Sequence, residues 1–236
     1  MKILQIIKRA FCDLFDIIYP EYCPGCGNLL SDYEKVVCLD CMSKMKITHT
    51  HLPENTEVKE VFMNKVEIQN ACAYYGFFKG GITQRLIHDF KYHNRPDIAV
   101  FLGKNAAYSL NKSGIFSDVD FIVPVPLHPN KFKKRGYNQS ERIAYGISQV
   151  LNIPINEDVL KKVVYNETQT KKKRMERWVN SQNLFKASDN PEFQGKHYLI
   201  VDDVLTTGST IESCVNEIQK IPNIKVSVFA LARAEK

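Results

Sequence analysis

Residues 199–210, LIVDDVLTTGST, are the stretch of this 236-residue sequence that best indicates its fold. Residues 197–201 are apolar and β-prone, which predicts a buried parallel strand, whereas residues 209–221 have the apolar spacing of a helix. The turn between them therefore joins the carboxyl end of a strand to the amino end of a helix. Ligands of open α/β sheets collect at this edge, where the free N–H groups and the dipole of the helix favour a phosphate.

The side chains of this turn indicate what such a ligand would carry. Gly208 lets the backbone approach the ligand closely. Asp202 and Asp203 repel phosphate, so they suit another part of the same ligand, either sugar hydroxyls or a hard cation such as Mg2+. The residues that can donate a hydroxyl to a phosphate are Thr206, Thr207, Ser209 and Thr210.

Residues 201–210 resemble the phosphoribosyl-pyrophosphate (PRPP) loop of type I phosphoribosyltransferases, in which hydrophobic residues precede an acidic pair and a turn of small residues. The resemblance implies that Asp202 and Asp203 face the ribose diol and that residues 206–210 hold the 5′-phosphate. An ordinary strand-to-helix turn with a Ser or Thr cap is the alternative. A Walker-type phosphate loop is excluded because no Gly-Lys-Ser/Thr ending is present.

Length and composition fit one α/β domain with a small additional module. Hydrophobic residues make up 44% of the sequence, which is enough for a sizeable core, and the net charge of +6 mildly favours anionic partners. Of the seven cysteines, four lie in two CxxC pairs. This spacing indicates metal binding in a reducing compartment rather than disulfides, so we expect a cytoplasmic protein.

The first 20 residues predict an amphipathic helix. Charged residues interrupt the apolar run and no small-residue cleavage site follows, so we expect neither a signal peptide nor a transmembrane segment. We expect the helix to pack on its own domain, and docking to a membrane surface or to a partner is the alternative. Its apolar face consists of Leu4, Ile7, Phe11, Leu14, Phe15 and Ile18.

The two CxxC pairs predict a structural metal site. Cys23 and Cys26 lie in CPGCG, and Cys38 and Cys41 in CLDC, with eleven residues between the pairs. Four thiolates close a tetrahedral Zn2+ site and leave no open position for catalysis. Because so short a module has no core of its own, the zinc would supply its folding free energy. Disulfides are the alternative.

Residues 42–65 show no clear period and are interpreted as a connector. We therefore predict two units: residues 1–65 with the first helix and the four-cysteine zinc knuckle, and residues 66–236 as a phosphoribosyltransferase-like domain. In the second unit we expect strands at 66–75 and 120–125 and helices at 82–92 and 97–110. No partner spacing accompanies His88 and His93, so we do not interpret them as metal ligands.

The strand at 120–125 leads into a proline-containing loop and a basic run. This strand, loop and following helix would form a second strand-end site in the same sheet. Solvated surface charge is an equal alternative for the lysines. The string RGYNQ places an aromatic ring beside two amides, where a base or a nucleic-acid strand could stack. The nucleic-acid-binding candidates here are Lys131, Lys133, Lys134, Arg135 and Tyr137.

Residues 164–185 are polar and basic, which favours a mobile lid over the site. Arg174 and Arg177 are candidates for neutralising a pyrophosphate leaving group. Trp178 could pack the lid shut or stack on a base. An exposed, charged helix is the alternative interpretation of this segment.

Together these strings resemble the ComF/ComFC competence family, phosphoribosyltransferase-like proteins with an amino-terminal zinc knuckle. The resemblance covers nearly the whole chain, in the order CPGCG with CLDC, LIHDFKY, VPVPLHP, KRGYNQS, RMERWVN and VDDVLTTGST. It implies a type I phosphoribosyltransferase fold, a parallel sheet flanked by helices, with Lys91 as a candidate pyrophosphate contact. It also implies a role in natural transformation, with incoming single-stranded DNA, a ComFA-like helicase and DNA-processing proteins as partners.

Three functions fit this sequence. The one we favour is handling of single-stranded DNA during uptake, with a site for PRPP and Mg2+ that tunes or enables this work. The second is a phosphoribosyltransferase of nucleotide metabolism that transfers ribose 5-phosphate from PRPP to an acceptor. The third is a zinc-stapled adaptor that has kept the fold without its chemistry. The complete acidic pair argues against the third function, but it does not prove turnover.

Overall fold

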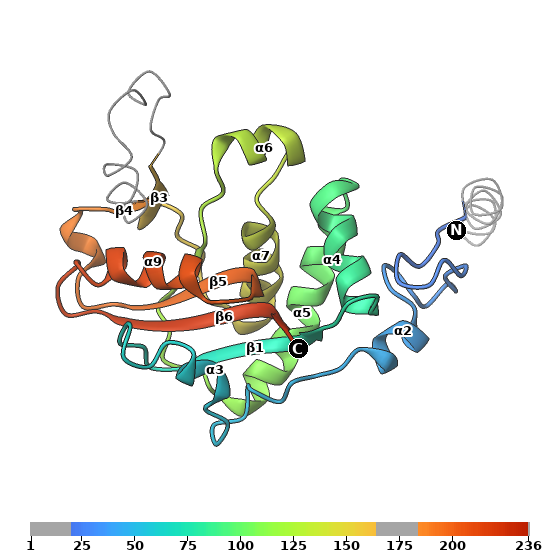
Figure 1. The fold of residues 1–236 in the computed structure, drawn as a ribbon, viewed down its shortest axis with the longest axis horizontal. Helices are drawn as coiled ribbons and strands as arrows, with labels where there is room; N and C mark the ends of the chain where they lie inside the picture. Colours follow the sequence, from blue (N-terminus) through green and yellow to red (C-terminus); the bar gives the residue numbers. More distant parts are fainter. Residues whose placement is uncertain (1–19, 164–183, 236) are drawn as a thin grey trace, which may run out of the picture.

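A four-stranded parallel sheet forms the centre of the computed structural model, which describes residues 20–163 and 184–235 (Figure 1). Its strand order is β1-β6-β5-β2. The four strands are β1 (Ala71–Phe77), β2 (Phe121–Pro124), β5 (His197–Leu205) and β6 (Lys225–Ala234). Strand β5 pairs with β2 on one side and with β6 on the other, so the acidic pair comes from a strand inside the sheet.

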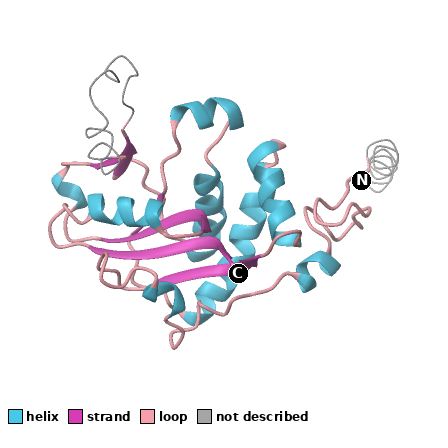
Figure 2. Ribbon diagram, in the orientation of Figure 1, coloured by secondary structure: helices cyan, strands magenta, loops and turns pink. Residues whose placement is uncertain are grey.

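Helices cover both faces of the sheet (Figure 2). One face packs against α4 (Ile82–Tyr92), α5 (Pro96–Ser113) and α7 (Gln139–Leu151). The other face packs against α9 (Ser209–Ile218) and the small hairpin of β3 (Leu160–Lys162) and β4 (Phe185–Ala187). Alternation along β5 explains the two cores, because Leu199 and Val201 face the first group, whereas Tyr198 and Ile200 face the second.

Shorter elements complete the described fold. The helix α2 (Leu39–Lys44) belongs to the cysteine module, and α6 (Pro129–Arg135) projects beyond the sheet (Figure 1). The helix α3 (Glu57–Glu60) precedes β1, and a 3-10 turn, η2 (Pro191–Phe193), precedes β5. None of the residues of α6 is buried, so its place depends on the segments that flank it.

Two glycines bring α5 and α7 into direct backbone contact. A Cβ at Gly146 of α7 would overlap the carbonyl oxygen of Val100, and a Cβ at Gly103 of α5 would overlap that of Ile143. Since any side chain at either position would push the helices apart, glycine sets this close crossing. The crossing holds α7 against the sheet and so positions the first turn of α7 near the end of β5.

Most of the predicted elements are observed, with differences in their bounds and number. The strand expected at 66–75 runs from Ala71 to Phe77. The strand expected at 197–201 continues to Leu205, so the acidic pair lies within the strand instead of following it. The strand β6 was not predicted, although it lies between β1 and β5. Among the described residues, no helix has both the length and the apolar character needed to cross a membrane.

The connector predicted at 42–65 packs on the sheet. Val58 and Phe62 are fully buried in the core that also contains α9. On the other side of the sheet, Cys23, Cys38 and Cys41 join the core formed by α4, α5 and α7. The boundary at residue 65 stays a prediction, and the amphipathic helix predicted in residues 1–19 lies outside the described residues.

Candidate functional site

The predicted phosphate turn lies between β5 and α9, as the sequence indicated. Gly208 caps the amino end of α9 with φ of 80°, a left-handed conformation that favours glycine. A Cβ there would also crowd the ring of Phe62, at 3.1 Å. The hydroxyl groups of Thr206, Thr207, Ser209 and Thr210 belong to exposed residues. A small hollow is lined by Asp202, Val204, Leu205, Thr206, Gly208, Ser209, Thr210 and Ile211.

The two aspartates are held by different helices. The hydroxyl of Ser140, in the first turn of α7, donates to Asp202 Oδ1 at 3.1 Å, and the N–H of Asp203 donates to the same oxygen at 2.9 Å. Lys91 Nζ, from α4, lies 2.8 Å from Asp203 Oδ2, and both side chains of this pair are mostly buried. The site is therefore assembled from β5, α4 and α7.

The charged form of the Asp202 side chain is unfavourable in the folded protein. Burial, followed by the neighbouring charge of Asp203, raises the pKa of the Asp202 carboxyl to about 7. The hydrogen bonds from the Asp203 N–H and Ser140, and the charge of Lys91, offset only part of this shift. A cation or hydroxyl donors would stabilise the charged form of this carboxylate. Both of these ligand chemistries were inferred from the sequence.

The RGYNQ string builds the wall behind the acidic pair, and this corrects the role predicted for Tyr137. The Tyr137 side chain is buried and its hydroxyl donates to the carbonyl oxygen of Phe90, so the ring is not accessible to a base. Asn138 caps α7 by accepting from the N–H of Ser140 at 3.1 Å, and its amide donates to Val125 O at 3.0 Å. These bonds fix the turn of helix that carries Ser140.

The basic run lies mostly on the exposed helix α6. Lys131, Lys133 and Lys134 are exposed, whereas Arg135 has structural contacts. The Arg135 guanidinium donates to Gln139 Oε1 at 2.7 Å and lies 5.3 Å from the centre of the Tyr92 ring. The structure thus separates Arg135 from the three lysines that precede it.

Lys162 is a candidate that the sequence analysis missed. It ends β3, and burial lowers the pKa of its ammonium group; the charge of Lys131 lowers this pKa further, whereas the charge of Asp202 opposes the shift. It also lines a groove of about 240 Å3 beside α6, together with Pro124, Pro126, Leu127, Pro129, Phe132, Asn138, Glu141, Glu157, Leu160 and Lys161. Nothing in the sequence around Lys162 signals this position, because only the fold brings β3 to the end of β5.

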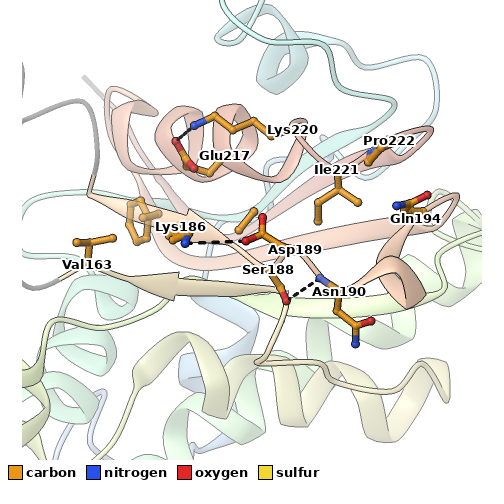
Figure 3. Close-up of a pocket in the computed structure, with 12 residues that line it drawn as sticks. Val163, Lys186, Ser188, Asp189, Asn190, Gln194, Glu217, Lys220, Ile221 and Pro222 are labelled. Carbon is orange, nitrogen blue, oxygen red and sulfur yellow. Dashed lines mark hydrogen bonds and ion pairs between the residues drawn. The ribbon is translucent and has the colours of Figure 1, made fainter.

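The remaining candidates and the larger cavity complete the description of the site. Arg174, Arg177 and Trp178 lie outside the described residues, so their predicted roles stay predictions. A cavity of about 510 Å3 lies at the far end of α9, between β4 and residues that include Glu217 and Lys220 (Figure 3). None of the residues predicted to bind PRPP lines it.

The four predicted zinc ligands converge. Their sulfur atoms all lie within 4.8 Å of one another, and Cys26 Sγ and Cys38 Sγ are 3.7 Å apart. Four sulfurs about 2.3 Å from a zinc ion at tetrahedral angles would be separated by about 3.8 Å, so this donor set fits Zn2+. Backbone N–H groups of Cys38 and Cys41 point at the sulfurs of Cys23 and Cys38, both at 3.4 Å, as suits thiolates. The cluster could therefore hold zinc.

Glycine is also required beside this cluster. A Cβ at Gly25 would lie 2.8 Å from the sulfur of Cys41 and 3.2 Å from a methyl carbon of Ile82. The first CxxC turn therefore packs against both the second cysteine pair and the start of α4. This contact links the cysteine module to the helix that carries Lys91.

We expect Cys38→Ser to lower the zinc content and the soluble yield of the protein, because three thiolates bind zinc more weakly and the metal supplies folding free energy. Elemental analysis of freshly purified protein should find one zinc per chain in the parent and less in the variant. Cys72→Ala, which removes a buried thiol outside the cluster, should keep its zinc. If elemental analysis found no zinc in the freshly purified parent protein, the assignment would be refuted.

We expect Asp202→Asn to stabilise the protein more at pH 8 than at pH 5. The unfolded chain loses this proton near the usual pKa of 3.8, and the folded protein only near 7, so the free energy of unfolding falls as the pH rises through that window. Thermal melts at both pH values test this, with the exposed Asp158→Asn as the control. A gain in stability that is equal at both pH values would contradict the assigned burial of charge.

Comparison with known proteins supports the sequence resemblance. The phosphoribosyl transferase domain family matches residues 138–233, which contain α7, β5, the phosphate turn, α9 and β6. Competence protein ComFC of Bacillus subtilis is 26% identical over 245 aligned residues, which cover 97% of each chain.

Two further relatives match over part of their length. Competence protein F of Haemophilus influenzae is 35% identical over 114 residues, 48% of this chain and 50% of that protein. The DNA utilization protein YhgH of Escherichia coli K12 is 30% identical over 152 residues, 63% of this chain and 66% of that protein. The matched stretch thus spans half of the first of these and about two thirds of the second. With its phosphoribosyltransferase-like sheet and its amino-terminal cysteine cluster, the chain belongs to the ComF/ComFC family of competence proteins.

Proposed function

We propose that this protein handles incoming single-stranded DNA in the cytoplasm during natural transformation and that it binds PRPP with Mg2+ at the end of β5. The observation that carries the proposal is the position of the acidic pair. Asp202 and Asp203 lie beside a hydroxyl-rich turn. Asp202 accepts a hydrogen bond from Ser140 of α7, the helix that follows the exposed basic helix α6 in the chain. The names of the relatives, competence and DNA utilization proteins, support the DNA part of the proposal.

The turn offers a phosphate both N–H groups and hydroxyls. In the proposed complex the 5′-phosphate lies at the amino end of α9, where the helix dipole favours an anion. The carboxylates of Asp202 and Asp203 accept from the ribose hydroxyls or bind the Mg2+ that accompanies PRPP. When bound, that ion would neutralise charge on the pyrophosphate group. Lys91, which neutralises Asp203 in this structure, is then close enough to contact pyrophosphate oxygens.

Transfer of ribose 5-phosphate is the second candidate function, and the groove beside α6 favours it. Its lining combines apolar side chains such as Leu127 and Phe132 with the amide of Asn138, a mixture that suits a flat heterocyclic acceptor. An acceptor nitrogen placed there would attack C1 of the ribose and lose its proton to solvent, and the bond from C1 to the pyrophosphate oxygen would break with its electron pair leaving on pyrophosphate. Lys162 would lie near the developing charge.

Single-stranded DNA would contact the lysines of α6 through its phosphates. Bases need exposed aromatic rings for stacking, and with Tyr137 buried the described residues offer Tyr92, 52% exposed, and Phe132, 48% exposed, on the same projecting part of the molecule. A ComFA-like helicase and other DNA-processing proteins would be the partners that deliver or receive the strand.

We expect Asp203→Asn to weaken PRPP binding in the presence of Mg2+ by tenfold or more. Loss of a charged ligand group costs about 1.5–3 kcal/mol, and each 1.4 kcal/mol is a factor of ten in affinity. Isothermal titration of PRPP into the parent and the variant measures the effect, with Asp158→Asn, an exposed carboxylate outside the turn, as the control. Equal affinities in a folded, zinc-containing variant would remove the acidic pair from the site.

We expect binding of a labelled oligothymidine to fall steeply with salt, and Lys133→Ala with Lys134→Ala to weaken it. Two lost phosphate contacts should reduce the slope of log affinity against log salt by about 1.4, since each contact contributes about 0.7 on single strands. Lys112→Ala with Lys225→Ala removes the same charge from exposed positions outside α6 and is the matched control.

Fluorescence anisotropy at several salt concentrations gives these slopes. Equal slopes in the α6 variant and the parent would contradict the proposed DNA contact. Absent DNA binding, together with pyrophosphate release when a nucleobase is added, would favour the transferase. Cells that lack the protein also distinguish the two functions. The DNA function predicts that they lose transformation and grow normally, whereas the metabolic function predicts that they require added nucleotides.

A further inference from the structure

Three side chains at the carboxyl end of α4 form a second cluster of metal-ligating groups. They are His88, Asp89 and His93, whose ligand atoms all lie within 4.8 Å of one another. Asp89 Oδ1 is 2.9 Å from His93 Nδ1 and 3.9 Å from His88 Nδ1. Both histidine side chains are more than half exposed, so an ion can reach the cluster from solvent.

The end of the helix explains why the spacing in sequence did not reveal this cluster. His88 and His93 are five residues apart, a separation that places side chains on different sides of a continuous helix. His93, however, is the capping residue that follows α4 and has left the helical path, with φ of −112° and ψ of 19°. Its N–H still donates to Asp89 O at 2.8 Å, and its ring centre lies 5.2 Å from that of His88. The interpretation of both histidines as groups without metal-ligand partners is thereby revised.

We propose that His88, Asp89 and His93 bind a divalent transition-metal ion of the Zn2+, Ni2+ or Co2+ class. Two imidazoles and one carboxylate are a donor set that suits such borderline ions. Ligand atoms about 2.0–2.1 Å from a tetrahedral ion lie about 3.3 Å apart, and the two distances to Asp89 lie on either side of this value. Small side-chain rotations therefore complete the site. The three ligands leave at least one coordination position open, unlike the closed set of four thiolates.

The surroundings of this cluster indicate what could bind at the open coordination position of the metal ion. Lys91 lies between the ligands in the sequence and contacts Asp203 with its ammonium group. The end of α4 also lies beside α6, as the contact between Tyr92 and Arg135 and Figure 1 show. A metal ion here adds positive charge near the acidic pair and the basic helix, and its open position takes water or an anionic oxygen.

The probe for this site is Ni2+, titrated into full-length, untagged protein whose zinc content has been measured. We expect one Ni2+ site in the parent and affinity at least tenfold weaker in His88→Ala with His93→Ala, because two of three ligands are lost. His128→Asn is the matched control, since it removes another imidazole while Asn can keep the cap that His128 provides to Asn130. Its Ni2+ affinity should equal that of the parent.

Two measurements keep this test independent of the other sites. After dialysis that removes loosely held ions from the exposed histidine cluster, elemental zinc should be one per chain in all three proteins, which shows that the cysteine cluster is intact. Asp89→Asn alone should weaken Ni2+ binding and change the visible spectrum of bound Co2+, as expected when a carboxylate ligand is lost. Unchanged Ni2+ affinity in the double histidine variant, or no saturable Ni2+ binding in the parent, would overturn the proposal. Neither result depends on whether the protein binds PRPP or DNA.

Discussion

Two adjacent carboxylates at the end of a buried strand are the constraint on which the arrangement of the site depends. Both side chains can carry a charge inside the sheet, so Asp202 and Asp203 each need polar partners of their own. Asp203 is matched by Lys91 from α4, and Asp202 by Ser140 from α7 and by the Asp203 N–H. Burial makes the charge on Asp202 costly to the folded protein, and carboxyl groups with a pKa raised in this way are common at functional sites.

These partners reach the acidic pair because the helices are placed with little freedom. Gly103 and Gly146 let α5 and α7 touch through their backbones. The hydrogen bond from Tyr137 to Phe90 ties the start of α7 to α4. Since α4 also packs against the first cysteine turn through Gly25, the cysteine module and the acidic pair are connected through one helix. A zinc ion held by the four cysteines would therefore also support the packing near Lys91.

The projecting end formed by α4 and α6 combines charge, aromatic rings and metal-ligating side chains without burying them. Lys133 and Lys134 are exposed on α6, and Tyr92 is half exposed under the guanidinium of Arg135. Exposed side chains of this kind contribute little to the stability of the fold. Their concentration in one region therefore favours the proposal that this region binds a polyanion. Of the nucleic-acid residues predicted from the sequence, Lys131, Lys133 and Lys134 are exposed and stay candidates, whereas Arg135 and Tyr137 have structural contacts.

The sequence by itself determined the local features of this protein. The strand-turn-helix around Gly208, the converging cysteine pairs and the amphipathic helices follow from short-range patterns, because backbone conformation and metal-ligand spacing are encoded within a few residues. Only the tertiary structure decided the rest. The buried role of Tyr137, the approach of Lys162 from β3 and the insertion of β6 between β1 and β5 depend on contacts between segments far apart in the chain. No local pattern specifies such contacts, because burial and register are settled only when the whole sheet and its helices pack together.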